Sequence, residues 1–171
     1  MRYALGPLRQ PAGRIVVELH AEAPPGTGAT AVAPVEGRLE LANVDSGISV
    51  RGHLRVPLEL ECSRCLDVFQ ETLEMDVNED CALRQIDAPE SYVEAAGEPY
   101  QIPILNDDEI DLTELVRQLI AMHLPIRPLC SATCPGLCPR CGQDLKAGPC
   151  GCQEPEPDPR WSALRGLKLE E

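Results

Sequence analysis

The sequence has few aromatic residues, few basic residues and no long hydrophobic run. Phenylalanine, tyrosine and tryptophan make up 3% of the 171 residues, which leaves little material for a surface that stacks nucleic-acid bases. Acidic residues outnumber basic ones by 28 to 15, and the net charge of −13 argues against binding of phosphate through bulk positive charge. The apolar runs are far shorter than the roughly 20 residues of a membrane-spanning helix. The first residues lack the apolar core of a signal peptide, so we expect a cytoplasmic protein with no membrane association.

Signatures of several enzyme classes are also missing. The sequence contains no phosphate-binding loop, no glycine-rich dinucleotide motif and no HExxH zinc-protease motif. None of His20, His53 and His123 forms a recognisable pair with a nucleophile, which favours solvated or half-buried histidines. An acidic run, interpreted as a solvated loop and a helix cap, consists of Asp107, Asp108, Glu109 and Asp111. We predict no catalytic residue and no small-molecule substrate.

Apolar and polar residues alternate over several segments, as in strands with one buried and one wet face. The alternation is longest over residues 48–62 and resumes over 69–83, and the turn between these two predicted strands carries two cysteines. Shorter strands are predicted over 14–19 and 35–41. Residues 100–104 predict a short edge strand because they include a proline, which cannot donate to a strand ladder. The pattern indicates a mainly antiparallel sheet.

The period then changes to that of a helix over residues 111–124. Asp111 is the expected N-cap, with Glu114 at the capping-box position, and Pro125 ends the helix. An acidic, proline-rich stretch follows the cysteine-rich segment, and Asp158 and Pro159 fit the start of a short terminal helix.

The predicted fold class is therefore α+β, with a mainly antiparallel sheet, one packed helix, a cysteine-rich zinc module and a short C-terminal helix. Residues 1–129 form the β-rich domain with helix 111–124. Residues 130–152 form the zinc module, and residues 153–171 form an acidic linker and the C-terminal helix.

Eight of the nine cysteines occur in closely spaced pairs: Cys62 and Cys65, Cys130 and Cys134, Cys138 and Cys141, Cys150 and Cys152. A reducing cytosol disfavours disulfides and favours metal ligation or catalysis. Four thiolates suit a tetrahedral zinc ion, and a two-residue spacing lets one tight turn present two sulfurs to the same metal. We expect two structural zinc ions.

The grouping of these cysteines has two solutions. The last four can close a site within one short segment, which leaves the first four for a site between the sheet turn and the segment after the helix. The other solution groups Cys130, Cys134, Cys138 and Cys141. The cysteine spacing is also compatible with an iron–sulfur cluster. A redox role for Cys62 and Cys65 is disfavoured, because no βαβ unit, the usual context of such dithiols, surrounds them. Cys81 falls on the apolar side of its strand and is predicted to be a core residue.

Several segments follow one another in a specific order: Val50-Arg51-Gly52, Leu60 to Leu66, Ile110-Asp111-Leu112, Leu124 to Cys130, Cys134 to Gly142, and Asp158-Pro159-Arg160. Together they resemble the YceD family, the large ribosomal RNA subunit accumulation proteins of bacteria and plastids. The resemblance begins at about Val35 and covers most of the chain after it.

The resemblance implies a role in the synthesis, processing or stability of large-subunit (23S) ribosomal RNA in a bacterium, without a recognised catalytic activity. The implied partner is a large-subunit ribosomal RNA precursor or a ribosomal or processing protein. Some family members keep only the first cysteine pair and metal-capable residues after the helix, which supports grouping Cys62 and Cys65 with Cys130 and Cys134. It also implies that the last four cysteines are a stabilising addition.

Direct contact with RNA or a partner would depend on local groups near the cysteines and at the terminal helix: Arg51, Arg55, Arg64, Arg127, Arg140, Lys146 and Trp161. Two other functions have requirements that the sequence does not meet. A metal-dependent nuclease or hydrolase needs an open metal position or a carboxylate pair, and neither is evident. A zinc-containing transcriptional regulator needs a basic recognition helix, whereas the predicted helix has one arginine, Arg117.

Overall fold

The computed structural model describes residues 1–44, 47–85, 101–105, 109–152 and 160. Its strands form one eight-stranded sheet in the order β1-β8-β7-β6-β5-β4-β2, with β3 paired to β5. The elements are β1 (Arg2–Ala4), η1 (Gly6–Arg9), β2 (Arg14–Ala21), β3 (Thr30–Ala31), β4 (Val35–Val44), β5 (Gly47–Glu61), β6 (Val68–Gln85), β7 (Gln101–Leu105), β8 (Glu109–Asp111), α1 (Thr113–His123) and η3 (Leu145–Ala147).

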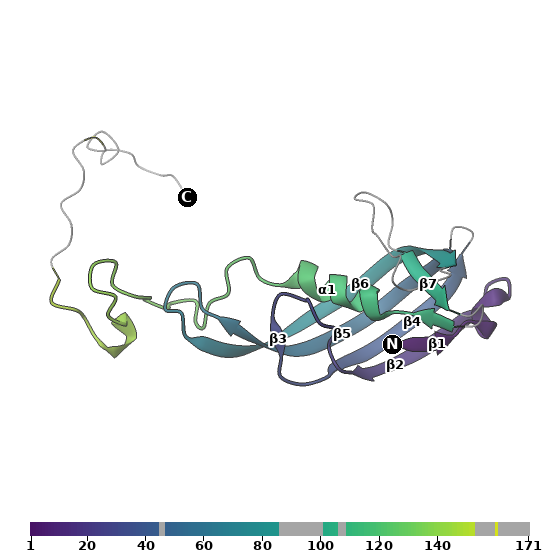
Figure 1. Cartoon of the computed structure of the whole chain (residues 1–171), viewed down its shortest axis with the longest axis horizontal. Helices are drawn as coiled ribbons and strands as arrows, with labels where there is room; N and C mark the ends of the chain where they lie inside the picture. The colour runs from purple at the N-terminus through teal and green to yellow at the C-terminus, as the bar shows by residue number, and fades with distance from the viewer. Residues whose placement is uncertain (45–46, 86–100, 106–108, 153–159, 161–171) are drawn as a thin grey trace.

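The sheet is antiparallel at every described pairing of its strands except that of β6 with β7, which is parallel. With α1 packed against it, this arrangement confirms the predicted α+β class (Figure 1). The predicted C-terminal helix lies outside the described residues, apart from Arg160.

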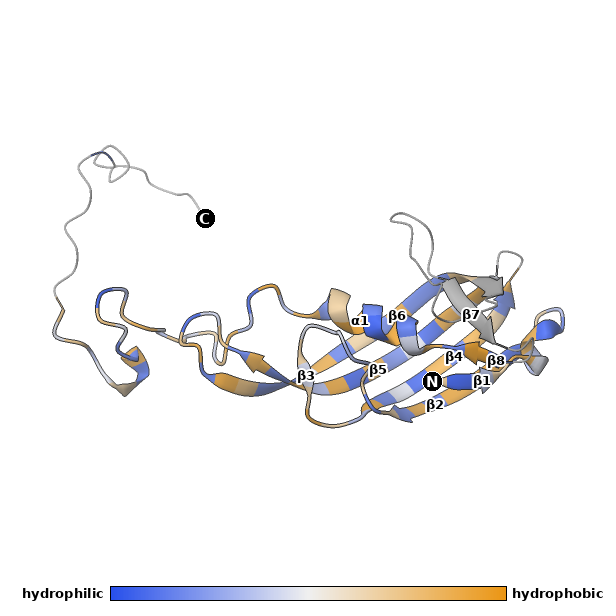
Figure 2. Cartoon of the chain, viewed as in Figure 1, coloured by the Kyte–Doolittle hydropathy of each residue, from blue (hydrophilic) through white to orange (hydrophobic). Residues whose placement is uncertain are grey.

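The hairpin of β5 and β6 is the longest feature of the fold. Ile48 lies opposite Cys81 at one end of the pairing, and Glu61 lies opposite Val68 at the other. Alternate side chains of these strands are buried, such as Leu54 and Met75. Figure 2 shows the matching alternation of hydrophobic and hydrophilic residues along the strands. The period of two in the sequence therefore arises from a sheet with one face in the core.

Helix α1 covers the apolar face of the sheet. Leu115, Val116, Leu119 and Ile120 are buried in the same core as the apolar side chains of the strands. The helix begins at Thr113 and not at residue 111, because Asp111 still belongs to β8 and pairs with Arg2 in β1.

Asp111 nevertheless contacts the start of the helix. Its Oδ1 accepts a hydrogen bond from the Thr113 backbone N–H at 2.9 Å. The predicted capping box is wrong, because the carboxylate of Glu114 binds the side chains of Arg117 and Gln118.

The predicted edge position of residues 100–104 is also wrong. The strand β7 lies inside the sheet, between β6 and β8. Of the β7 residues, only Ile104 and Leu105 pair with β8, so Pro103 has no β8 partner that requires its missing N–H; on its other side it lies opposite Arg84 of β6. Among the described residues, no helix is long and apolar enough to span a membrane.

The cysteine-rich part of the chain extends beyond the end of the sheet that carries the β5–β6 turn (Figure 1). A small second core forms there, with Cys62, Cys65 and Cys134 buried against Phe69 and Leu129. The turn of the long hairpin and the segment after α1 therefore meet at a core that is separate from that of the sheet.

Candidate metal centres

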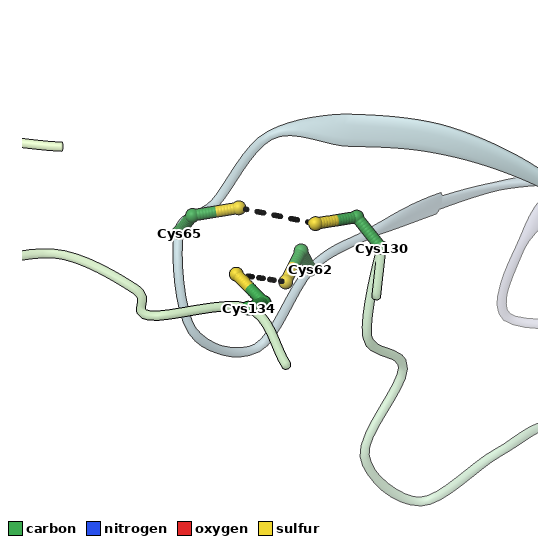
Figure 3. Close-up of side chains that lie close together, drawn as sticks. All are labelled: Cys62, Cys65, Cys130 and Cys134. Carbon is green, nitrogen blue, oxygen red and sulfur yellow. Dashed lines mark hydrogen bonds between the residues drawn. The ribbon is translucent and has the colours of Figure 1, made fainter. Parts of the chain in front are cut away.

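The first cluster, which we call cluster 1, joins two distant parts of the chain. Cys62 and Cys65 lie in the tight turn between β5 and β6, and Cys130 and Cys134 lie in the segment that follows α1. The four side chains point toward one another (Figure 3). A backbone hydrogen bond from the N–H of Ser63 to the carbonyl of Pro128, 2.9 Å long, also joins the two segments.

The sulfur distances within cluster 1 match those of a four-thiolate metal site. The Sγ atoms of Cys62 and Cys134 are 3.9 Å apart, and those of Cys65 and Cys130 are 3.7 Å apart. All four sulfurs lie within 4.8 Å of one another. A tetrahedral zinc ion with Zn–S bonds of about 2.3 Å sets its sulfurs about 3.8 Å apart. A disulfide requires about 2.05 Å, so these cysteines are not disulfide-bonded.

Cluster 1 is shielded from water. Cys62, Cys65 and Cys134 expose 0%, 4% and 2% of their surface, and Cys130 is half-buried. Burial raises the pKa of Cys134 to about 12, whereas backbone N–H groups, foremost that of Cys130, lower the pKa of Cys62 to about 6. Cys62 therefore forms a thiolate readily, whereas a Cys134 thiolate needs a cation to compensate its charge.

The second cluster, cluster 2, is built from one short segment and consists of Cys138, Cys141, Cys150 and Cys152. Their sulfurs also lie within 4.8 Å of one another. The pKa of Cys138 is lowered to about 6 by the backbone N–H groups of Cys141 and Arg140, and the Arg140 N–H donates to Cys138 Sγ at 3.4 Å. Cys138 is buried, Cys150 is half-buried, and Cys141 and Cys152 are exposed.

Both clusters use the same turn at a Cys-x-x-Cys pair. The N–H of Leu66 donates to the carbonyl of Cys62, and the N–H of Gly142 donates to the carbonyl of Cys138, each at 2.9 Å. The residue after the second cysteine has a positive φ in both turns, 63° for Leu66 and 72° for Gly142. The backbone folds so that both cysteine side chains of each pair point to one site.

The two clusters are connected by Lys146, which lies on η3 between the cysteines of cluster 2. Its Nζ pairs with Asp67 Oδ2 at 2.6 Å. The pKa of Lys146 is raised by Asp67 and then by its hydrogen bonds to the sulfurs of Cys65 and Cys130. The loop closed by cluster 2 thus places the Lys146 ammonium beside cluster 1.

Backbone contacts strengthen this connection. The N–H of Leu137 donates to the carbonyl of Arg64 at 3.1 Å, and the guanidinium of Arg64 donates to the carbonyl of Cys134 at 2.8 Å. Gly136 has a φ of 76°, and a Cβ there would lie 2.9 Å from the Arg64 carbonyl oxygen. Close packing of the two segments therefore requires glycine at position 136.

The arrangement matches the first of the two groupings that the sequence allows, and the alternative set of Cys130, Cys134, Cys138 and Cys141 is not brought together. Cys81 is buried in the sheet core as predicted, and burial raises its pKa to about 12. Within the described residues, no further group of three or more potential ligands meets at one point. The Lys146 link to cluster 1 was not predicted, because no sequence spacing connects it to Asp67.

Two of the predicted binding arginines lie on the exposed face of the sheet. Arg51 pairs with Asp80 at 3.9 Å and hydrogen-bonds Asn78, and Arg55 pairs with Glu36 at 2.7 Å. The arginines predicted to share one exposed face do lie there, and acidic residues of the neighbouring strands compensate their positive charges.

The other predicted binding residues lie near the clusters or beyond the described chain. Arg64 holds the carbonyl of Cys134, and Arg127 and Arg140 are exposed. Trp161 lies outside the described residues, as do Asp107 and Asp108 of the acidic run.

The part of the chain that holds both clusters matches a known protein family. The sequence model described as "Large ribosomal RNA subunit accumulation protein YceD" matches residues 50–168. An uncharacterized protein of Mycobacterium tuberculosis is 32% identical over 126 residues, which cover 74% of this chain and 58% of that protein. An uncharacterized protein of Mycobacterium leprae is 30% identical over 135 residues, covering 79% of this chain and 59% of that protein. The chain thus spans less than two thirds of the length of these relatives.

A chloroplastic protein of Arabidopsis thaliana is named large ribosomal RNA subunit accumulation protein YCED homolog 1. It is 32% identical over 60 residues, which cover 35% of this chain and 19% of that protein. No solved structure matches the chain. The family match includes all eight clustered cysteines and well over half of the sequence. The chain belongs to the YceD family.

Proposed function

We propose that this chain is a non-enzymatic cytoplasmic factor that supports the synthesis, processing or stability of large-subunit (23S) ribosomal RNA. The family description names accumulation of this RNA and no reaction, which supports the proposal. We also propose that each cysteine cluster holds one structural zinc ion. The observation that carries the zinc assignment is the convergence of four sulfurs, 3.7 and 3.9 Å apart in facing pairs, in a core shielded from water.

Cys62, Cys65, Cys130 and Cys134 would hold the first ion, and Cys138, Cys141, Cys150 and Cys152 the second. Zinc bound there would supply charge compensation and a fixed crosslink. Four thiolates fill a tetrahedral coordination sphere, so such a site has no open position for a reacting water. This favours a scaffold over a metal-dependent nuclease or hydrolase. Residues 130–152 would then form a zinc module at the end of the β-rich domain, residues 1–129, followed by an acidic linker and helix, residues 153–171.

Metal analysis tests the zinc assignment. Protein purified without added metal is expected to contain close to two zinc ions per chain by elemental mass spectrometry. An iron–sulfur cluster places several iron and sulfide atoms between its ligands and needs these sulfurs farther apart. Iron in place of zinc, or protein without bound metal, would contradict the proposal.

A complementation experiment tests the ribosomal role. Cells that lack this protein are expected to accumulate less large-subunit RNA relative to small-subunit RNA. Wild-type protein and Cys81→Ala, which alters only the cysteine outside the clusters, should restore the ratio. The pair Cys62→Ser with Cys65→Ser should not restore it. An unchanged ratio in cells without the protein would refute the proposed role.

A further inference from the structure

The turn of cluster 1 carries a leucine where the equivalent turn of cluster 2 carries glycine. Leu66 and Gly142 occupy the same position after a Cys-x-x-Cys pair, make the same 2.9 Å hydrogen bond and have φ values of 63° and 72°. An L-residue with a side chain is disfavoured in this left-handed region, whereas glycine adopts it freely. A leucine there requires an explanation that the turn geometry does not provide.

Packing among the described residues does not explain it. The Leu66 side chain is 55% exposed and is not among the residues that form the two cores. Val68 follows at the start of β6 and is 60% exposed. A strained backbone that positions an exposed apolar side chain is typical of a binding site.

A third apolar side chain lies in the segment that contacts this turn. Ile126 is 99% exposed and lies two residues before Pro128, whose carbonyl accepts the hydrogen bond from Ser63. We call Leu66, Val68 and Ile126 the apolar tip. Its residues come from the β5–β6 turn, the start of β6 and the segment after α1, and the Ser63–Pro128 hydrogen bond joins this segment to the turn. In Figure 1 the turn lies beyond the part of the sheet that α1 covers.

The charges around the apolar tip favour a cationic partner. Exposed acidic residues flank this turn, Glu59 and Glu61 on β5 and Glu71 on β6, and exposed Asp67 lies in the turn itself. Glu61 lies directly opposite Val68 in the ladder. Of the nearby basic groups, Arg64 is bound to the Cys134 carbonyl and Lys146 to Asp67, while Arg127 is exposed. A zinc ion with four thiolates would add a net charge of −2, so an RNA phosphate would be repelled here.

We propose that the apolar tip is a docking surface for a lysine- and arginine-rich protein segment that carries an apolar anchor. The anchor packs on Leu66, Val68 and Ile126, and the basic side chains pair with the carboxylates of Glu59 and Glu61, which share the face of Val68. The identification of this partner with a ribosomal protein rests on the proposed function, whereas the surface itself does not.

Site-specific photo-crosslinking in cells identifies the occupant. The full chain carries p-benzoylphenylalanine in place of Leu66 or, as a control, in place of Val16, which is 49% exposed on β2 at the other edge of the sheet. The expected result is a nuclease-resistant adduct at position 66, absent at position 16, that mass spectrometry assigns to a strongly basic protein. A nuclease-sensitive RNA adduct, the same adduct at both positions, or none at position 66 would overturn the proposal.

Two variants then test the role of the Leu66 side chain. Their affinity is measured for the purified partner protein that the crosslink identifies. Leu66→Gly should keep its metal content and its melting temperature, because glycine favours this φ, while its affinity falls by about tenfold or more. Leu66→Met, which keeps an apolar side chain, should retain most of the affinity. Equal binding by wild type and Leu66→Gly would refute the docking surface while leaving the complementation result intact. Leu66-dependent binding with an unchanged ribosomal RNA ratio would instead refute the ribosomal role.

Discussion

Cluster 1 and cluster 2 have the same four donors and the same turn but differ in burial and in the chain they connect. Cluster 1 is almost completely buried and joins the tip of a hairpin to the segment after α1. Cluster 2 has two exposed cysteines and lies within one segment. The comparison shows that similar sequence spacing can build a crosslink of the fold in one place and a local loop closure in another.

The largest expected difference is in stability. Cys62→Ser with Cys65→Ser should remove one of two metal ions and lower the free energy of unfolding by several kcal/mol, because the binding energy of a structural zinc is coupled to folding. Cys138→Ser with Cys141→Ser should also remove one ion but leave the melting of the sheet almost unchanged. Metal content by elemental mass spectrometry and thermal unfolding by circular dichroism measure both effects. Equal loss of melting temperature in the two double variants would mean that the clusters do not differ in this way.

The next difference is in the rate of metal release. A chromogenic chelator should remove the ion of cluster 2 about tenfold or more faster than that of cluster 1, since Cys141 and Cys152 are accessible to water. Absorbance after mixing should therefore rise in two phases. Each double variant should lack one of them, the slow phase in the Cys62 and Cys65 variant. A single phase in the wild type would contradict the expected difference in accessibility.

A smaller effect is expected where the clusters are connected. Lys146→Met removes the ammonium that faces Asp67 and the sulfurs of Cys65 and Cys130. The slow phase of release should accelerate on the order of tenfold, as for other residues that contact metal ligands. Arg140→Met is the matched control, because Arg140 is an exposed residue of the cluster 2 turn whose backbone N–H contacts Cys138. If both variants released metal like the wild type, the two clusters would be independent.

The smallest effect concerns the residue after each Cys-x-x-Cys pair. Gly142→Leu places a side chain at a φ of 72° and should destabilise the cluster 2 turn by about 1 kcal/mol. The fast release phase should accelerate accordingly, while the slow phase stays unchanged. A fast phase like that of the wild type would show that the cluster 2 turn tolerates leucine without cost.

Features that depend on residues close together in the sequence were predictable. The alternation over 48–62 predicted β5, and the spacing of the last four cysteines predicted a cluster that one segment can close. The interior position of β7 was not predictable from its proline. A proline is tolerated in an inner strand when the adjacent strand pairs with other residues, as β8 does with Ile104 and Leu105. The Lys146 contact depends on how two loops pack, which no periodic pattern records.

The separation of the cysteines along the chain also sets an order of assembly. Cys62 and Cys134 are 72 positions apart, so cluster 1 cannot close until the hairpin, α1 and the segment after it have all been synthesised. Closing a loop of this length costs about 1.5 kcal/mol more chain entropy than closing the short segment of cluster 2. A metal ion at cluster 1 would therefore mark a chain whose early and late parts have already come together. Metal binding at cluster 1 would therefore require that these parts have folded together, whereas metal binding at cluster 2 would require only one short segment.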